Sequence, residues 1–325
     1  MIDNIEEVNE EIEQYSITRI KVVGVGGWGN SAVERLKQVG VKGVEFIAVN
    51  TNQQDLLRSN ADKRIQIGGK LTKGLGAGSS PNVGKESANE SRKLIAEIIK
   101  DTDLLFIACG MGGGTGTGAA PIIAEVAKEL GILTIAVVTK PFDFEGARRA
   151  INAQIGIAEM KKFVDTLVIV PNEKLMQVVP KGTKLADAFN FVDDTLRQAI
   201  QGITDLITNA GLINLDFADV ETIMKKKGLA YMGIGRGRGE NRTIDAVRSA
   251  VASPLLETTL EGATGIILNV CGNLESLGLE EVNEAANLVK DIVSLDATIV
   301  VGISNNDNTN DEITVTVIAT GIETK

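Results

Sequence analysis

Two glycine-rich loops constrain the fold of this chain more than any other feature. Residues 24–30 (GVGGWGN) follow a β-branched run at 18–25, and residues 109–118 (CGMGGGTGTG) follow an apolar run at 103–110. Each loop leads into a segment whose apolar residues recur at helical spacing, so each should join a buried strand to a helix. Glycine lets the backbone approach an anion, and the amides that begin a helix attract negative charge. The sequence therefore predicts a phosphate-binding edge of a parallel sheet.

The order of the remaining patterns predicts an α/β chain in two parts joined by a helix. In the first part we expect strands at 18–25, 44–50, 103–110, 132–142 and 166–172, with helices at 31–39, 85–100 and 119–130. Strands that alternate with helices indicate a parallel, Rossmann-like sheet covered on both faces. About 25 residues of helical pattern at 184–208 predict a long central helix. In the second part we expect helices at 217–227, 241–252 and 279–293 and strands at 264–271, 297–304 and 312–319, an α+β domain with a mixed sheet.

Composition excludes several classes of function. The chain of 325 residues has no histidine, which rules out Ser-His-Asp triads, Cys-His dyads and zinc sites with histidine ligands. Its net charge of −10 and the lack of a long basic run argue against nucleic-acid binding. Two cysteines fit a reducing cytosol. No run of about 18 apolar residues predicts a membrane span, and the acidic start is not a signal peptide, so we expect a cytoplasmic protein without direct membrane insertion.

The glycine loops leave two kinds of nucleotide site open. The first loop matches GxGxxG, typical of NAD-dependent Rossmann oxidoreductases, but the next strand ends in Asn50 rather than in the acidic residue that binds the ribose. A Rossmann domain also has one such loop, whereas this chain has two. No GxxxxGK[ST] motif is present, which excludes an ordinary P-loop NTPase. An oxidoreductase therefore remains the less favoured alternative to a site that holds phosphates by backbone amides, threonine hydroxyls and helix dipoles.

Several motifs together resemble the FtsZ/tubulin superfamily. The most specific is GGGTGTG at 112–118. The others, in chain order, are GVGGWGNSAV at 24–33, NTNQQDL at 50–56, GLGAG at 74–78, PFDFEGARR at 141–149, NLDFADVETIM at 214–224, MGIGRGRGENR at 232–242 and VTVIATG at 315–321. NLDFADV points to the FtsZ branch rather than to eukaryotic tubulin. The resemblance covers residues 17 to 321, nearly the whole globular chain.

The resemblance implies a self-assembling GTPase that polymerises head to tail into protofilaments, as in the bacterial division ring at mid-cell. Its ligands would be GTP and GDP, with Mg²⁺ held mainly by phosphates and water. Its partners would be other copies of itself, with division or tethering proteins as further candidates. The domains implied are an N-terminal tail at 1–16, predicted to be disordered, a GTP-binding domain at 17–183, a central helix at 184–209, an activation domain at 210–321 and a tail at 322–325.

The resemblance also implies a nucleotide site, residue by residue. It assigns phosphate contacts to the first loop and to the signature loop, recognition of the γ-phosphate to the loop at 74–78, ribose and phosphate contacts to the segment after 132–142, and guanine contacts to the central helix and its approach. The residues implied, in that order, are Gly26, Gly27, Trp28, Gly29, Asn30 and Ser31; Gly114, Thr115 and Gly116; Ala77 and Gly78; Glu145 and Arg149; and Asn172, Phe189 and Asp193. A carboxylate facing the donor edge of guanine would select guanine over adenine.

Two carboxylates beyond the central helix are implied to act in catalysis. Asp216 and Asp219 are three residues apart at the start of a predicted helix, where acidic residues are also ordinary because the helix dipole favours them. The resemblance assigns them to the GTP of the next subunit, where they would orient the attacking water. The resemblance thus implies catalysis in trans, switched on by assembly, and the large separation in sequence between these residues and every phosphate loop fits it.

Three departures from the family pattern leave the cellular role open. Trp28 replaces a glycine, and residues 79–81 (SSP) replace Ala-Asn-Pro. In a phosphate loop we expect the indole to turn away from the phosphates. After Lys325 the sequence lacks the linker and terminal peptide by which division proteins of this family recruit membrane tethers. It represents either a shortened chain or a relative with another filament role, such as plasmid or phage partition.

Overall fold

The computed structural model describes residues 18–177, 182–208, 216–253, 260, 262–294, 296–305 and 311–322. The tail predicted at 1–16 and most of the tail predicted at 322–325 lie outside these ranges, as do residues 214 and 215 of the NLDFADV motif. The described chain forms one ten-stranded sheet with the strand order β3-β2-β1-β4-β5-β6-β7-β10-β8-β9. The first six strands have the order of a Rossmann sheet, in which the direction of strand addition reverses between β1 and β4.

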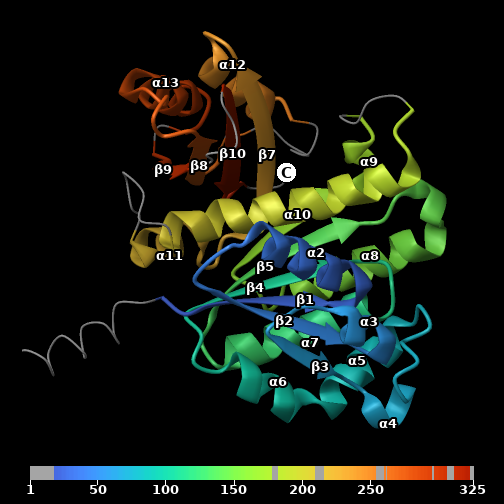
Figure 1. The fold of residues 1–325 in the computed structure, drawn as a ribbon. Coiled ribbons are helices and arrows are strands. Elements are labelled where there is room, and N and C mark those ends of the chain that lie inside the picture. Colours follow the sequence, from blue (N-terminus) through green and yellow to red (C-terminus); the bar gives the residue numbers. More distant parts are fainter. Residues whose placement is uncertain are drawn as a thin grey trace, which may run out of the picture.

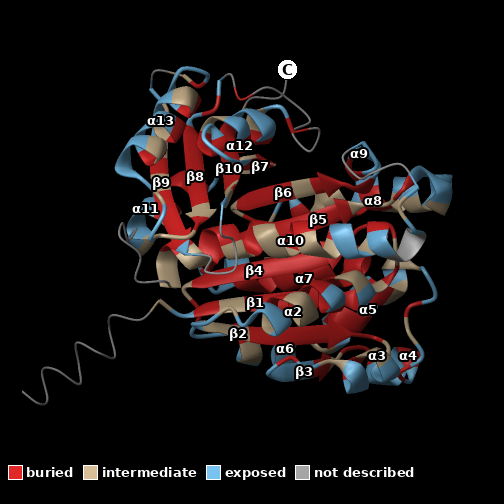
Figure 2. Ribbon diagram, turned by 45° about the horizontal axis from the view of Figure 1, so that its top comes forward, coloured by how far each residue is buried: buried red, intermediate tan, exposed pale blue. Residues whose placement is uncertain are grey.

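The first part of the chain is a parallel sheet between two helical layers. Its strands are β1 Ile20–Val25, β2 Val44–Asn50, β3 Lys63–Gln66, β4 Leu104–Gly110, β5 Leu133–Lys140 and β6 Thr166–Pro171. Its helices are α2 Gly26–Val39, α3 Gln53–Arg58, α4 Gly69–Thr72, α5 Pro81–Glu90, α6 Arg92–Ile99, α7 Thr115–Glu129, α8 Ala147–Met160 and α9 Asn172–Leu175, with a short 3₁₀ turn η1 Asp143–Glu145. Every strand pair within this part is parallel. The strands inside this sheet are almost wholly buried (Figure 2), as apolar runs without alternation require, whereas the edge strand β3 exposes Lys63 and Arg64.

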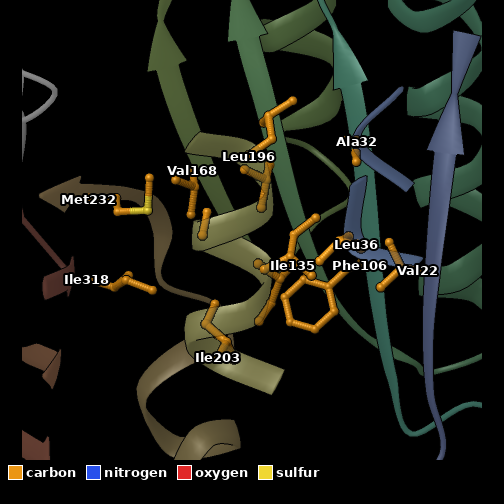
Figure 3. Close-up of a cluster of buried hydrophobic side chains, with 14 of the residues drawn as sticks. Val22, Ala32, Leu36, Phe106, Ile135, Val168, Leu196, Ile203, Met232 and Ile318 are labelled. Atoms are coloured by element: carbon orange, nitrogen blue, oxygen red, sulfur yellow. The ribbon is translucent and has the colours of Figure 1, made fainter. Parts of the chain in front are cut away.

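A long helix, α10 Leu185–Thr208, joins the two parts. It lies across one face of the sheet beside α2, whereas α5, α6, α7 and α8 cover the other face (Figure 1). Its apolar stripe includes Leu196 and Ile203, which share one core with Phe106 and Ile135 of the first part and Ile318 of the second (Figure 3). The helix therefore joins the two parts through one hydrophobic cluster that both share, while each part also has a cluster of its own.

The second part completes the sheet with mixed strand directions. Its elements are α11 Phe217–Met224, β7 Gly228–Arg238, α12 Arg242–Val251, β8 Gly265–Gly272, α13 Leu279–Lys290, β9 Thr298–Asn305 and β10 Glu312–Thr320. Strand β10 is antiparallel to both β7 and β8, while β8 and β9 are parallel. The predicted fold class is thus confirmed: a parallel Rossmann-like domain, a long central helix and an α+β domain with a mixed sheet.

Strand β7 was not predicted, because glycine interrupts its apolar pattern. In this GIGRGR segment the glycines face α12: a side chain at Gly235 would overlap the carbonyl of Ala246, and one at Gly237 the carbonyl of Arg242. Glycine at these alternate positions lets the helix pack directly on the strand. The start of β7 also pairs in parallel with β6 from Thr166 to Val168, which makes the two sheets one.

The prediction of one helix at 85–100 had the wrong bounds. The structure has two helices here, α5 beginning at Pro81 and α6 ending at Ile99, separated by Ser91. Proline suits the first turn of a helix, where its missing N–H leaves no bond unmade. Ser91 leaves the helical region with φ −102° and ψ 10°, so the chain changes direction there. Within the described residues, no helix is both long and apolar enough to span a bilayer.

Candidate functional site

The two glycine loops meet where strands β1 and β4 lie side by side. Strand β1 leads into α2 on one face of the sheet, and β4 leads into α7 on the other, so a crevice opens between them. In open α/β sheets ligands bind in such a crevice. Gly26 has φ +72°, and a side chain there would come within 3.0 Å of the Gly116 backbone nitrogen. A side chain at Gly116 would come within 3.4 Å of the Val25 carbonyl oxygen in the first loop and within 2.6 Å of the Gly110 carbonyl oxygen in its own loop. Only glycine allows the two loops to approach this closely.

A small cavity of about 200 Å³ lies in this crevice. It is lined by backbone groups, neutral side chains and the carboxylate of Asp55, mostly from the ends of β1, β2 and β4 and the segments that follow them. The lining residues are Val25, Gly26, Gly27, Trp28, Asn50, Thr51, Asn52, Asp55, Gly76, Gly110, Gly113, Gly114, Thr115 and Gly116. The hydroxyls of Thr51 and Thr115 lie 2.7 Å apart and link the two sides. Neither lysine nor arginine lines the small cavity, so in the described part of the chain any anion there would be held by amides and hydroxyls.

A larger cleft of about 700 Å³ adjoins the small cavity. It runs along α2 between α3 and α10, and its lining residues are Gly27, Trp28, Asn30, Ser31, Glu34, Arg35, Gln38, Asp55, Arg58, Ser59, Phe189 and Asp193. Gly27, Trp28 and Asp55 line both spaces, so they mark where the two meet. A ligand with an anionic end and a planar end could occupy both.

Aromatic rings line the boundary between the two spaces. The half-buried Trp28 indole meets the Phe189 ring edge-on, with ring centres 5.1 Å apart. Phe189 in turn meets Phe142 at 5.7 Å. The indole thus packs on α10 and still borders the small cavity, rather than turning fully away from it.

Two buried acceptors among the predicted guanine contacts have no partner: one belongs to Asp193, which lines the larger cleft, and the other to Asn172, which lines neither space. Asp193 Oδ1 and Asn172 Oδ1 are buried, and neither accepts a hydrogen bond from any described residue. Burial raises the pKa of Asp193 to about 6, opposed by the positive charge of Arg35. A buried acceptor without a donor is costly, so this arrangement favours a ligand that brings hydrogen-bond donors.

Gly29 and Asn30 shape the first loop; Gly29 lines neither space, whereas Asn30 also lines the larger cleft. A side chain at Gly29 would overlap the carbonyl oxygen of Ala108, so this glycine lets α2 pack on β4. Asn30 is 7% exposed, and its amide, oriented to suit its neighbours, donates to the carbonyls of Gly24 (2.8 Å) and Gly26 (3.1 Å). These contacts hold the loop in its curved form.

Four predicted residues lie beside the signature loop without lining either space. Ala77 packs against Gly114, where an added side chain would come within 2.8 Å of the Ala77 Cβ; Gly78 follows it and is exposed. Glu145 forms an ion pair with Arg149 and accepts a hydrogen bond from the Phe142 backbone nitrogen at 3.0 Å. Their roles toward a nucleotide therefore stay predictions.

The two predicted catalytic carboxylates lie at the opposite end of the molecule. Asp216 is the residue before α11, Asp219 lies in its first turn, and both are exposed. Figure 1 shows α11 at one end of α10, whereas α3, α8 and α9 lie toward its other end. Helix α10 has 24 residues, which at 1.5 Å per residue is about 36 Å. Within one chain the carboxylates and the cleft that Phe189 and Asp193 line are therefore at different ends of this helix.

Sequence reasoning missed Thr51 and Asp55, both of which line the small cavity. Thr51 is fully buried, and Asp55 lies in the first turn of α3. A signal was present, because both belong to the NTNQQDL motif that follows β2.

Comparisons with known proteins agree with this geometry. Residues 19–180 match the model of the tubulin/FtsZ family GTPase domain, and residues 228–323 match that of the FtsZ family C-terminal domain. An empty FtsZ dimer from M. jannaschii is 46% identical, with a TM-score of 0.92 over 98% of this chain and 92% of that one. A mutant FtsZ from M. jannaschii is 45% identical, with a TM-score of 0.93 over 98% and 96%. A GTPγS-bound protofilament of CetZ2 from Haloferax volcanii, 19% identical with a TM-score of 0.77 over 94% of each chain, shares the fold.

Proposed function

The chain belongs to the tubulin/FtsZ family of GTPases, and we propose that it assembles head to tail into protofilaments that hydrolyse GTP between subunits. The observation that carries this proposal is the separation of the acidic residues from the glycine loops. Asp216 and Asp219 are exposed beyond one end of α10, and both cavities lie toward its other end. A neighbouring copy stacked end to end would bring its α11 to this chain's nucleotide. Family membership leaves the NAD-dependent oxidoreductase without support.

The nucleotide would lie across both spaces. Amides of Gly26, Gly114 and Gly116 would hold the phosphates in the small cavity, with the positive ends of α2 and α7 adding attraction. The base would reach Phe189 and the buried acceptors of Asn172 and Asp193, whose missing donors match the N1–H and N2–H₂ groups of guanine. Glu145 and Arg149 would move toward the ribose and α-phosphate from the segment after β5.

Hydrolysis would use groups from two chains. One subunit would hold the phosphates, and Asp216 and Asp219 of the next would orient the water that attacks the γ-phosphate. Mg²⁺ would be held there mainly by the phosphates and by water, which this ion usually retains. When bound, the ion would neutralise charge that develops on the phosphates.

We propose the domain division at 17–183, 184–209 and 210–321, with the first carrying the nucleotide and the third the catalytic carboxylates. In the cell the filament would belong to a division ring, since both family models include FtsZ. Tethering proteins would be its further partners.

Assembly and turnover measured together test this function. With GTP the protein should sediment as polymer above a threshold concentration, and phosphate release per molecule should rise above the same threshold. With GDP it should stay in the supernatant. Equal activity per molecule at every concentration would contradict hydrolysis between subunits, and retained NAD on denaturation would contradict a guanine nucleotide.

Trp28 provides an optical readout of this site. Because it is the single tryptophan and borders both spaces, its fluorescence should shift or be quenched when GDP or GTP is added to nucleotide-free protein. Trp28→Gly should still bind GTP, with affinity changed by about 0.5–1.5 kcal/mol, the worth of an aromatic contact. A tryptophan emission spectrum that does not change when nucleotide is added would place the indole away from the ligand. Complete loss of GTP binding in Trp28→Gly would show that the indole is essential for binding.

A further inference from the structure

Asp55 lies where the two spaces meet, and the proposed function gives it no role. It is the third residue of α3 and lines both the small cavity and the larger cleft. Among the described residues that line the small cavity, it is the one with a charged side chain. A carboxylate placed beside the phosphate site needs a physical explanation.

The protein holds this carboxylate in place. Asn50, which is 2% exposed, donates from Nδ2 to Asp55 Oδ2 at 3.3 Å. The same Asn50 accepts from the backbone nitrogen of Asn52 at 3.1 Å through Oδ1, and its amide nitrogen also lies 3.2 Å from the oxygen of Asn30. Within the described chain the other oxygen, Asp55 Oδ1, has no hydrogen-bond partner. A buried amide at the end of β2 therefore orients the carboxylate and leaves one oxygen available.

The Asp55 carboxylate disfavours binding of a nucleotide that carries no cation. The phosphates of GTP are strongly anionic, and a carboxylate at the same cavity repels them. No lysine or arginine among the described lining residues of the small cavity offsets either charge. A divalent cation between carboxylate and phosphates would turn the repulsion into attraction.

The carboxylate also suits the way Mg²⁺ binds. Mg²⁺ retains several waters and takes one or two carboxylates together with substrate phosphates. The described residues contain no group of three or more acidic or cysteine side chains that could hold a metal by themselves. An ion at this site would thus need the nucleotide as a ligand.

We infer that Asp55 positions Mg²⁺ on the phosphates of the bound nucleotide, directly or through one of the ion's water molecules. The inference rests on the proposed binding of GTP. Asp55 acts here as a positioning residue: it couples the binding of the metal to that of the nucleotide, and Asn50 fixes its orientation.

The coupling can be measured on nucleotide-free full-length protein by titrating GDP calorimetrically in EDTA and in excess MgCl₂. In the wild type Mg²⁺ should strengthen GDP binding. In Asp55→Asn the ratio of the two dissociation constants should shrink by about 10- to 100-fold, the usual effect of removing a group that orients a metal. In EDTA alone Asp55→Asn should bind GDP at least as tightly as the wild type. Asp55→Lys should bind GDP tightly without Mg²⁺, because the ammonium replaces the cation.

Asp143→Asn is the matched control, since this acid is exposed after β5 and lines neither space. It should keep the wild-type ratio. Electron paramagnetic resonance of Mn²⁺ gives a second readout: GDP-loaded Asp55→Asn should hold Mn²⁺ more weakly than GDP-loaded wild type.

Three outcomes would overturn the inference: an unchanged ratio in Asp55→Asn, unchanged Mn²⁺ affinity, or an equal loss of GDP affinity with and without Mg²⁺. The last result would assign Asp55 to the ribose instead. Failure of the wild type itself to bind GDP or GTP would reject the proposed function rather than the role of Asp55.

Discussion

Asp216→Ala should bind GTP with wild-type affinity and lose GTPase activity by about 10²- to 10⁴-fold, the usual contribution of a positioned acid or base. Asp216 lines neither space, and its side chain caps nothing in α11, so its loss should leave binding and folding unchanged. Filaments of the variant should persist longer, because GTP stays intact between subunits. Phosphate release and sedimentation measure the two effects.

Asp245→Ala is the matched control for this variant. Asp245 is likewise an exposed acid near the start of a helix: it lies in the first turn of α12, whereas Asp216 directly precedes α11, so its removal costs a similar favourable interaction with the helix dipole. It should hydrolyse GTP normally. Normal turnover in Asp216→Ala would remove the catalytic assignment.

Mixing two inactive variants distinguishes catalysis in trans from catalysis in cis. Gly113 lines the small cavity, and a Cβ there would meet no atom within 4 Å, so Gly113→Glu should fold and repel the phosphates. It keeps Asp216 but binds no GTP, whereas Asp216→Ala binds GTP but lacks the carboxylate. If hydrolysis occurs between subunits, the mixture should regain activity that neither variant has alone. A mixture as inactive as its components would reject the trans mechanism.

The sequence predicted β1, β2, β4, β5 and β6 because they are buried on both faces, but it missed β3 (KRIQ), a short edge strand that is partly exposed. Strands buried on both faces are unbroken apolar runs, and β4 (LLFIACG) is buried at every position. Strand β7 was not predicted, because glycines interrupt its apolar run. Its glycines at 235 and 237 are required by the closeness of α12, a tertiary contact that no local pattern shows.

The glycine loops were recognisable in sequence, but the separate roles of their residues were not. Gly26 and Gly29 belong to one motif, yet Gly26 lines the small cavity while Gly29 packs against β4. Asp55 was overlooked because an acid was sought at the end of β2, where Asn50 stands. The structure places the carboxylate five positions later, in contact with that asparagine. Only the fold shows which side chains of α3 turn toward the loops.

Asp193→Asn should weaken GTP binding by about 1–3 kcal/mol, because the nucleotide loses a charged acceptor in a buried site. An asparagine oxygen could still accept one hydrogen bond, whereas a carboxylate can accept from both N1–H and N2–H₂ of guanine. ATP offers no such pair of donors, so its weaker binding should change little. Titration of both nucleotides into nucleotide-free protein measures the loss of selectivity. Asp194→Asn is the control, since Asp194 is bonded to Arg197 at 2.7 Å instead.

The raised pKa of Asp193 adds a dependence on pH. With a pKa of about 6 in the empty protein, Asp193 is protonated below that pH and cannot accept both donors. GTP affinity should therefore fall by up to about tenfold per pH unit below 6, and this slope should be absent in Asp193→Asn.

Stability should change in the opposite direction to affinity. Because burial raises the pKa of Asp193 in the fold above its ordinary value of 3.8, the charged form is disfavoured, and the empty protein loses stability as the pH rises from about 4 to 6. Asp193→Asn removes this penalty and should stabilise the nucleotide-free protein at pH 7 by about 1–3 kcal/mol. Thermal unfolding of empty wild type and variant measures the gain. A variant that binds both nucleotides less well and unfolds earlier would show that Asp193 supports the fold rather than the base.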